Sequence, residues 1–203
     1  MGLHKETGAG ADWRSGLAGV ALVILIASVL MLSGDSGMEW LRFDRDGIAA
    51  GELWRLLSGH LTHLGWSHFA LNSAGLILVW YLVGTAYSPL AWLLIAAVAI
   101  ATIDICFWFL NPELTWYVGL SGVLHALLVA GVLARLGDLN AETVILAALI
   151  VAKLAWEQFN GPLPGSETTS GGPVIVDAHL YGAAGGVLGG LVTRIRVQLR
   201  ASL

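Results

Sequence analysis

The stretch Leu90–Leu110, LAWLLIAAVAIATIDICFWFL, is long and apolar enough to cross a membrane as one helix. Asp104 is its single charged residue. Five further apolar runs flank it in the chain, at Leu17–Leu32, Ser67–Gly84, Leu120–Leu136, Glu142–Phe159 and Val176–Ile195. The sequence therefore predicts an all-α polytopic membrane protein, built as a bundle of six transmembrane helices.

Composition favours the same class. The chain has 203 residues, of which 57% are hydrophobic and 12% charged, whereas about 25% of the residues of a soluble domain are charged. It has no basic patch with interleaved aromatic residues, so we expect no nucleic-acid partner. Cys106 is the only cysteine, which excludes an intramolecular disulfide. We expect one domain over residues 1–203, with a cytoplasmic tail over 1–15 and an outer loop over 33–58.

The distribution of Lys and Arg predicts how the helices are oriented. The cationic residues near the expected helix ends are Lys5, Arg14, Arg135, Arg194, Arg196 and Arg200. The loop 161–177 has no Lys or Arg, which is typical of an outer loop. Both termini are therefore expected in the cytoplasm. His68, Ser121 and His179 then lie near the outer ends of the second, fourth and sixth helices, at one depth in the membrane.

A serine and a histidine at one depth form a candidate nucleophile and base. Ser121 lies between Gly119 and Gly122, and a serine hydroxyl needs a base to become a nucleophile. His179 is the best candidate for that base. The alternative is structural: Ser121 could bond a carbonyl one turn back, and His179 could join two helices. Polar groups at membrane depth are costly, which favours a functional role.

Small residues recur every fourth position on two of the expected helices. They are Gly182, Gly186 and Gly190 on the sixth, and Gly122, Ala126 and Ala130 on the fourth. Small residues at this spacing let helix backbones approach closely. Such an approach is what a Ser–His hydrogen bond requires.

Other polar residues could complete a site. His68 and Asn72 are four residues apart, on one helical face, and both can donate hydrogen bonds to an oxyanion beside the Ser121 N–H. His125, one turn after Ser121, could stack on or hydrogen-bond His179, or help to retain water. The alternative for Asn72 is a bond between helices.

Three more features allow simpler roles. His60, His63 and His68 could bind a metal, but no His-Glu-x-x-His motif is present, and we expect no metal site. The pair Trp54-Arg55 is expected to anchor the first loop at the interface. Lys153 and Glu157 are four apart and could pair across one turn, in the less favourable order.

Taken together, these residues resemble the rhomboid intramembrane serine proteases. The matching motifs are Trp54-Arg55, His63-x4-His68-x3-Asn72, Gly119-x-Ser121-Gly122 and Ala178-His179-x2-Gly182-x3-Gly186. The resemblance implies a six-helix core and a Ser–His dyad without a third acid. It implies that Ser121 is the nucleophile and His179 the base. His68, Asn72 and the Ser121 N–H would form the oxyanion hole, and neither metal nor cofactor is implied.

A subgroup is more similar still. Typical rhomboids carry Tyr at the position of His125, whereas Gly119-Leu-Ser-Gly-Val-Leu-His125, Lys153-Leu-Ala-Trp-Glu157-Gln158 and Val176-Asp-Ala-His-Leu-Tyr-Gly182 resemble rhombosortase. Ala126 replaces the glycine usual in that subgroup. The resemblance implies substrates with a C-terminal GlyGly-CTERM tail: Gly-Gly, a membrane helix and a basic cluster.

The sequence thus predicts a serine endopeptidase of the bacterial inner membrane with its active site toward the periplasm. A general rhomboid protease for other membrane substrates is the nearest alternative. A catalytically inactive rhomboid-like protein that binds transmembrane helices is another, although Ser121 and His179 are both present. A small transporter or channel would carry more charges within its helices or an inverted repeat.

Overall fold

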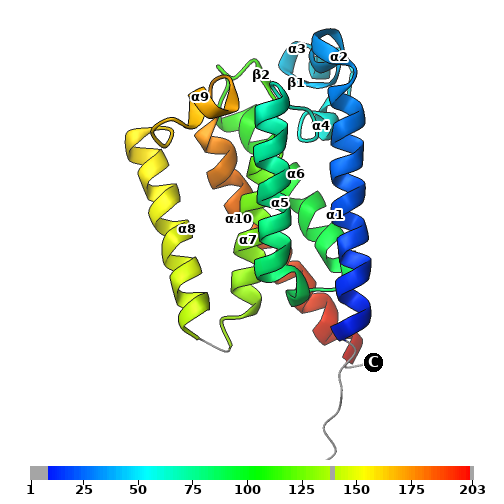
Figure 1. Cartoon of the computed structure of the whole chain (residues 1–203), viewed down its shortest axis with the longest axis vertical. Coiled ribbons are helices and arrows are strands. Elements are labelled where there is room, and N and C mark those ends of the chain that lie inside the picture. The colour runs from blue at the N-terminus through cyan, green and yellow to red at the C-terminus, as the bar shows by residue number, and fades with distance from the viewer. Residues whose placement is uncertain (1–8, 138–139, 202–203) are drawn as a thin grey trace, which may run out of the picture.

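Helices make up most of the part of the chain that the computed structural model describes, residues 9–137 and 140–201 (Figure 1). Six long helices form the bundle: α1 (Ala9–Met31), α5 (Trp66–Val83), α6 (Pro89–Leu110), α7 (Ser121–Ala134), α8 (Ala141–Asn160) and α10 (Val176–Ala201). The short elements are α2 (Gly34–Leu41), β1 (Phe43–Asp44), α3 (Arg45–Ala49), α4 (Arg55–Ser58), η1 (Gly84–Ala86), β2 (Trp116–Tyr117) and α9 (Ser166–Ser170).

The six long helices coincide with the six apolar runs. Helix α1 begins at Ala9 rather than near residue 17, and α10 continues to Ala201 rather than ending near 195. Hydropathy marks only the apolar part of each helix, whereas the polar flanks can continue the same backbone hydrogen bonding. Lys5, one of the orienting cations, lies outside the described residues.

Successive long helices alternate in direction. Figure 1 shows the first turns of α5, α7 and α10 at one end of the bundle, together with all the short elements from α2 to α4 and α9. The start of α1 and the end of α10 lie at the opposite end. The end that carries α2, β1, α3, α4, β2 and α9 is called the loop end below, and the first turns that contain His68, Ser121 and His179 lie there.

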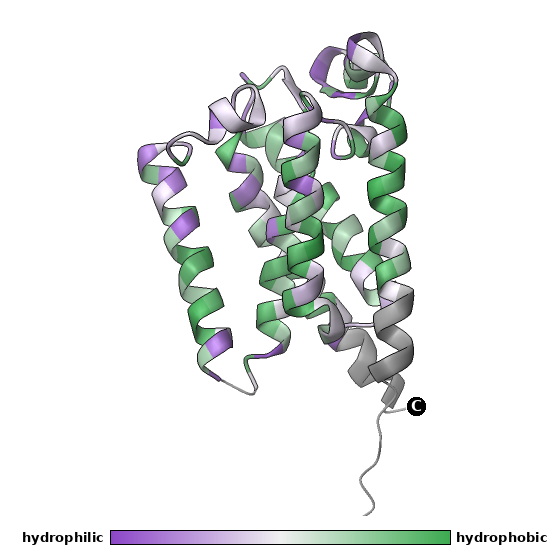
Figure 2. Ribbon diagram, in the orientation of Figure 1, coloured by the Kyte–Doolittle hydropathy of each residue, from purple (hydrophilic) through white to green (hydrophobic). Residues whose placement is uncertain are grey.

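The helices are apolar along most of their length, and hydrophilic residues gather mainly in the loops and toward the helix ends, including the last turns of α8 (Figure 2). Trp66–Ala86 and α6 are each long and apolar enough to cross a membrane, and α1 with the bent α2 makes a third span if counted as one. Helix α7 has 14 residues, or about 21 Å at 1.5 Å per residue. It is shorter than the roughly 30 Å hydrocarbon core, so Ser121 begins a helix that cannot cross that core alone.

Local sequence sets the ends of these helices. Ser88 caps α6, with its hydroxyl accepting from the N–H of Ala91, and Pro89 occupies the first turn. Asn140 caps α8 by accepting from the N–H of Thr143. Gly161, with φ of 79°, ends α8 in a conformation that glycine adopts without strain.

Helix α10 lies at the centre of the packing because glycines occupy two of its faces. Toward α7, a Cβ added to Gly182 would overlap the Gly122 carbonyl, and one added to Gly186 would overlap the Ala126 carbonyl. Toward α6, a Cβ on Gly185 would lie 2.7 Å from the Ala99 Cα. The small residues at every fourth position therefore bring the α7 and α10 backbones into direct contact, as the sequence predicts.

The chain between α1 and α5 forms a compact layer over the loop end of the bundle. Its strand β1 pairs antiparallel with β2, aligning Phe43 with Tyr117 and Asp44 with Trp116. Arg45 donates to the carbonyls of Phe107, Trp108 and Asn111 at the end of α6, and to that of Leu114 beyond it. These bonds satisfy carbonyls that a helix end leaves unpaired and tie the layer to the bundle.

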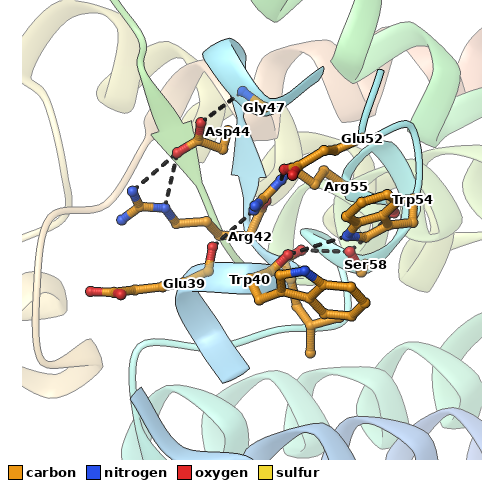
Figure 3. Close-up of polar contacts among 10 residues, drawn as sticks. Glu39, Trp40, Arg42, Asp44, Gly47, Glu52, Trp54, Arg55 and Ser58 are labelled. Carbon is orange, nitrogen blue, oxygen red and sulfur yellow. Dashed lines mark hydrogen bonds and ion pairs between the residues drawn. The ribbon is translucent and has the colours of Figure 1, made fainter. Parts of the chain in front are cut away.

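Arg55 holds this layer together from inside (Figure 3). Its guanidinium donates to the carbonyls of Glu39 and Arg42 at 2.8 and 3.0 Å and pairs with the Glu52 carboxylate. Trp54 is partly exposed, packs on Trp40 at 5.0 Å between ring centroids, and donates to the Trp40 carbonyl. The Trp54-Arg55 motif thus stabilises the first loop through contacts within the loop.

Candidate active site

Ser121 is the first residue of α7, and the loop before it determines where the helix starts. Gly119 has φ of +131°, a backbone conformation that favours glycine. A Cβ at this position would lie 2.9 Å from the His68 ring, so a side chain would also collide with His68. The Gly119 carbonyl accepts from the Tyr117 hydroxyl at 2.6 Å, and its N–H donates to the Gly59 carbonyl at 3.0 Å.

His179 lies in the first turn of α10, opposite Ser121. Its Nε2 is 2.9 Å from the Ser121 Oγ, a hydrogen-bond distance, and its side chain is almost fully buried. Residues 58 positions apart in the chain meet here because Gly182 and Gly122 let their helices touch. This is the separation that a nucleophile and its base require.

The structure adds a third group that sequence reasoning did not assign to the site. The Glu157 Oε2 on α8 lies 2.8 Å from the His179 Nδ1, and Glu157 is 3% exposed. The Lys153 Nζ lies 2.6 Å from the other oxygen of Glu157, which confirms the predicted pair across one turn. The resemblance implied a dyad without a third acid, whereas in this chain a carboxylate lies within hydrogen-bond distance of the His179 ring. An acidic residue at membrane depth was the available signal.

His125 packs against His179 as one of its predicted arrangements requires. Their rings stack with centroids 4.3 Å apart and planes at 21°. The His125 Nδ1 is 2.8 Å from the Ser121 carbonyl, which only accepts hydrogen bonds, so this nitrogen carries the proton. The His125 ring thus fixes one face of the His179 imidazole.

His68 and Asn72 lie on one face of α5, close to the start of α7. His68 packs its ring on Gly119 and accepts from the Leu64 N–H through Nδ1 at 3.3 Å. Asn72 is buried, and its amide donates to the His68 carbonyl at 3.2 Å. The amide has a second N–H, so one donor remains for another partner.

His63 supports this wall of the site. Its ring meets the His68 ring edge to face at 5.0 Å and packs similarly on Phe69. Burial lowers the pKa of His63 from 6.5 to about 3, and the nearby His68 adds to the shift. His63 is therefore neutral at physiological pH and acts as a packing group.

The three histidines considered for a metal site have other partners. The His60 Nε2 bonds the Asp104 carboxylate at 3.1 Å, whereas His63 and His68 pack on each other. A different group, His125, Glu157 and His179, has ligand atoms within 4.8 Å of one another. Imidazole nitrogens bind a metal in the plane of the ring, and the two stacked rings do not share a plane. The Lys153 ammonium already pairs with the Glu157 carboxylate, so this arrangement does not favour a cation.

A comparison with known families covers most of this chain. The Rhomboid domain family matches residues 50–196, a range that includes Trp54, Ser121, Glu157 and His179. None of the curated proteins matches the chain. Since the family match extends over well more than half of the sequence, this helical membrane protein belongs to the rhomboid family, whose members are generally intramembrane serine proteases.

Proposed function

We propose that the chain is an intramembrane serine endopeptidase in which Ser121 is the nucleophile and His179 the general base. The observation that carries the proposal is the 2.9 Å distance from the His179 Nε2 to the Ser121 Oγ at the loop end of the bundle. A hydroxyl bonded to an unprotonated imidazole nitrogen is the arrangement that serine proteases use. The rhomboid family match supports the same reaction class.

The reaction follows from these two groups. The Ser121 oxygen forms a bond to the scissile carbonyl carbon, and its proton passes to the His179 Nε2. Collapse of the tetrahedral intermediate breaks the carbon–nitrogen bond, and the same proton goes to the leaving amine. Water then attacks the acyl-enzyme, with His179 again taking and returning the proton.

The oxyanion would be bound by the Ser121 N–H, His68 and Asn72. The Ser121 N–H lies at a helix start, where N–H groups have no partner within the helix and the positive end of the dipole favours an anion. His68 packs on Gly119, two residues before the nucleophile, and the buried Asn72 lies one turn further along α5. Loss of one such donor costs roughly 2.7–4 kcal/mol of transition-state stabilisation.

The proposed substrates are membrane-anchored proteins with a C-terminal GlyGly-CTERM tail. Support comes from the resemblance of the segments around His125, Glu157 and His179 to rhombosortase. The proposed location is the bacterial inner membrane, with both termini cytoplasmic and the loop end toward the periplasm. A general rhomboid protease, and an inactive binder of transmembrane helices, remain as alternatives for the same family.

Co-expression with membrane reporters tests this function. One reporter ends in Gly-Gly, a hydrophobic helix and a basic tail; a second has Leu-Leu in place of Gly-Gly; a third is a general rhomboid substrate. We expect the wild type to cleave only the first and Ser121→Ala to cleave none. Ser28→Ala is the matched control, since the Ser28 hydroxyl bonds the Ile24 carbonyl within α1, and it should cleave like the wild type.

Three other outcomes each identify a different error. Cleavage of the third reporter but not the first would show a general rhomboid protease. Equal cleavage by Ser121→Ala and the wild type would show that Ser121 is not the nucleophile. A wild type that binds the reporter helices but cleaves none of the three would support the inactive binder.

A further inference from the structure

Helix α8 contributes a charged pair to a site whose two proposed reacting groups lie on α7 and α10. Glu157 is buried against His179, with 2.8 Å between the Oε2 and the Nδ1, and its Oε1 lies 2.6 Å from the Lys153 Nζ. Lys153 also lies 3.4 Å from the His179 Nδ1. Four side chains therefore form one continuous polar chain, from Lys153 through Glu157 and His179 to Ser121.

The chain of contacts fixes which nitrogen of His179 carries the proton. An ionised carboxylate only accepts hydrogen bonds, so the short contact to Glu157 requires an N–H at Nδ1. The ring nitrogen that faces the Ser121 Oγ is then unprotonated and can accept the hydroxyl proton. Without the carboxylate, the Lys153 ammonium, a donor only, would be the polar neighbour of Nδ1. The proton would then be placed on Nε2, and His179 could not act as a base.

Lys153 in turn keeps the carboxylate charged and oriented. A buried carboxylate is expensive unless it is paired and hydrogen-bonded. Lys153 supplies the charge to one oxygen, which leaves the other free for His179.

We propose that Glu157 is the positioning residue for His179, completing a Ser121–His179–Glu157 triad, and that Lys153 orients Glu157. The inference rests on the proposed function and names the group that prepares its base. During acylation the proton moves from the Ser121 oxygen to the His179 Nε2 and on to the leaving amine. The Glu157 carboxylate accepts the Nδ1–H bond throughout and takes no proton.

The alternative is a purely structural role, in which the Lys153–Glu157 pair only holds α8 against α10. Replacing Glu157 by Gln separates the positioning role from the structural role, because Lys153 determines which way the side-chain amide of the glutamine is oriented. In Glu157→Gln the ammonium takes the amide oxygen, and the amide nitrogen then faces the His179 Nδ1. An N–H facing Nδ1 forces the proton onto Nε2, the wrong tautomer. Replacing Lys153 by Met as well removes that constraint, and the amide can turn its oxygen to His179.

The experiment measures kcat and KM for cleavage of the Gly-Gly reporter by the purified protein in detergent, for the wild type and four variants. We expect Glu157→Gln to lower kcat by about 10²- to 10⁴-fold, with KM nearly unchanged, and Lys153→Met to lower kcat about tenfold or less. The double variant Lys153→Met with Glu157→Gln should have a kcat at least about tenfold above that of Glu157→Gln alone. Glu142→Gln, an exposed carboxylate on the same helix, should match the wild type.

A purely structural role for the pair does not predict that the second substitution, Lys153→Met, restores kcat to the Glu157→Gln variant. If the pair were only structural, the double variant would be as inactive as Glu157→Gln or more so, and kcat would follow thermal stability across the series. Either observation would overturn the proposal, as would a Glu157→Gln variant as active as the wild type.

A measurement that needs no substrate separates this inference from the proposed function. In ¹⁵N-histidine-labelled wild type, NMR should show His179 protonated at Nδ1, with a downfield N–H proton that disappears in Glu157→Gln. A wild type with this signal but no cleavage would contradict the protease proposal and leave the Glu157 contact established. A His179 protonated at Nε2 in the wild type would contradict the triad even if the chain cleaves.

Discussion

At the residue scale, the environment of Ser121 consists of contacts that each need one residue type. Gly119 adopts φ of +131° beneath the His68 ring, and the Ser121 carbonyl holds His125 in place to stack on His179. The imidazole of His179 is thus fixed on its face by His125 and at both ring nitrogens by hydrogen bonds. A base held in this way loses little entropy when the substrate reacts.

His63 gives a prediction for stability against pH. Its pKa is about 3 in the folded chain against 6.5 for a free imidazole, so below pH 6.5 the unfolded state takes up a proton that the folded state does not. Stability therefore falls as the pH drops from 6.5 toward 3, by up to about 1.4 kcal/mol per pH unit. Thermal unfolding at about pH 6.5 and pH 5 should show that His63→Phe loses up to about 2 kcal/mol less than the wild type. Equal losses in the two proteins would contradict the buried, neutral state of His63.

The sequence was enough to predict that Ser121 and His179 lie together, and stacking on His179 was one of the arrangements predicted for His125. It was not enough to predict the contact between Glu157 and His179. A Lys and a Glu four residues apart satisfy each other within one helix, and this local explanation conceals a longer contact. The second oxygen of the carboxylate reaches His179, and only the approach of α8 to α10 shows this.

At the element scale, α10 is the helix on which the site depends. Its glycines at 182 and 186 contact α7, and those at 185 and 189 contact α6. The first set was recognised from the fourfold spacing. The second was not, because its partners Ala99 and Ile95 lie in an apolar run without any pattern that indicates contact with α10.

Adding one methyl group to this helix contact should damage both fold and site. In Gly182→Ala the new Cβ overlaps the Gly122 carbonyl, and moving two backbones apart costs about 1–3 kcal/mol. The Ser121–His179 distance would lengthen with it, so cleavage activity should fall strongly. Gly19→Ala on α1 is the control, since a Cβ there meets nothing within 4 Å. Thermal unfolding and reporter cleavage check both variants, and a Gly182→Ala protein as stable and active as Gly19→Ala would contradict the packing.

Helix α8 contacts the rest of the bundle through a narrow strip of buried residues. Its buried residues among those described are Thr143, Ile150 and Glu157, seven positions apart on one face. Large apolar residues on its other faces, such as Phe159, are exposed in the absence of lipid. Glu157, at one end of this row of buried residues, is the one that reaches the candidate site. The position of α8 and the protonation of the His179 ring are therefore linked.

At the scale of the whole molecule, the layer between α1 and α5 covers the loop end and is joined to the bundle through Arg45 and the β1–β2 ladder. The sequence predicted an outer loop over residues 33–58 but no defined fold. Its order comes from arginines that bond carbonyls distant in the chain, and such contacts leave no periodic pattern.

Arg55 is the test of that layer. It is almost fully buried and bonds two carbonyls and the Glu52 carboxylate, so Arg55→Ala removes hydrogen bonds to three partly buried acceptors, at about 0.5–1.5 kcal/mol each. We expect a lower unfolding temperature and faster proteolysis within residues 33–58. Arg194→Ala, an exposed arginine at the opposite end, is the control. Unchanged proteolysis of the loop in Arg55→Ala would show that the network in Figure 3 does not hold the layer together.

The proposed nucleophile is tested most directly by mapping a fluorophosphonate adduct by mass spectrometry on the purified protein in detergent. A working nucleophile reacts with this probe without a substrate, so the result does not depend on the substrate class. We expect an adduct on Ser121 alone, absent in His179→Ala and much slower to form in Glu157→Gln. An adduct on another serine, or one on Ser121 that forms equally fast without His179, would contradict the proposed roles of Ser121 and His179.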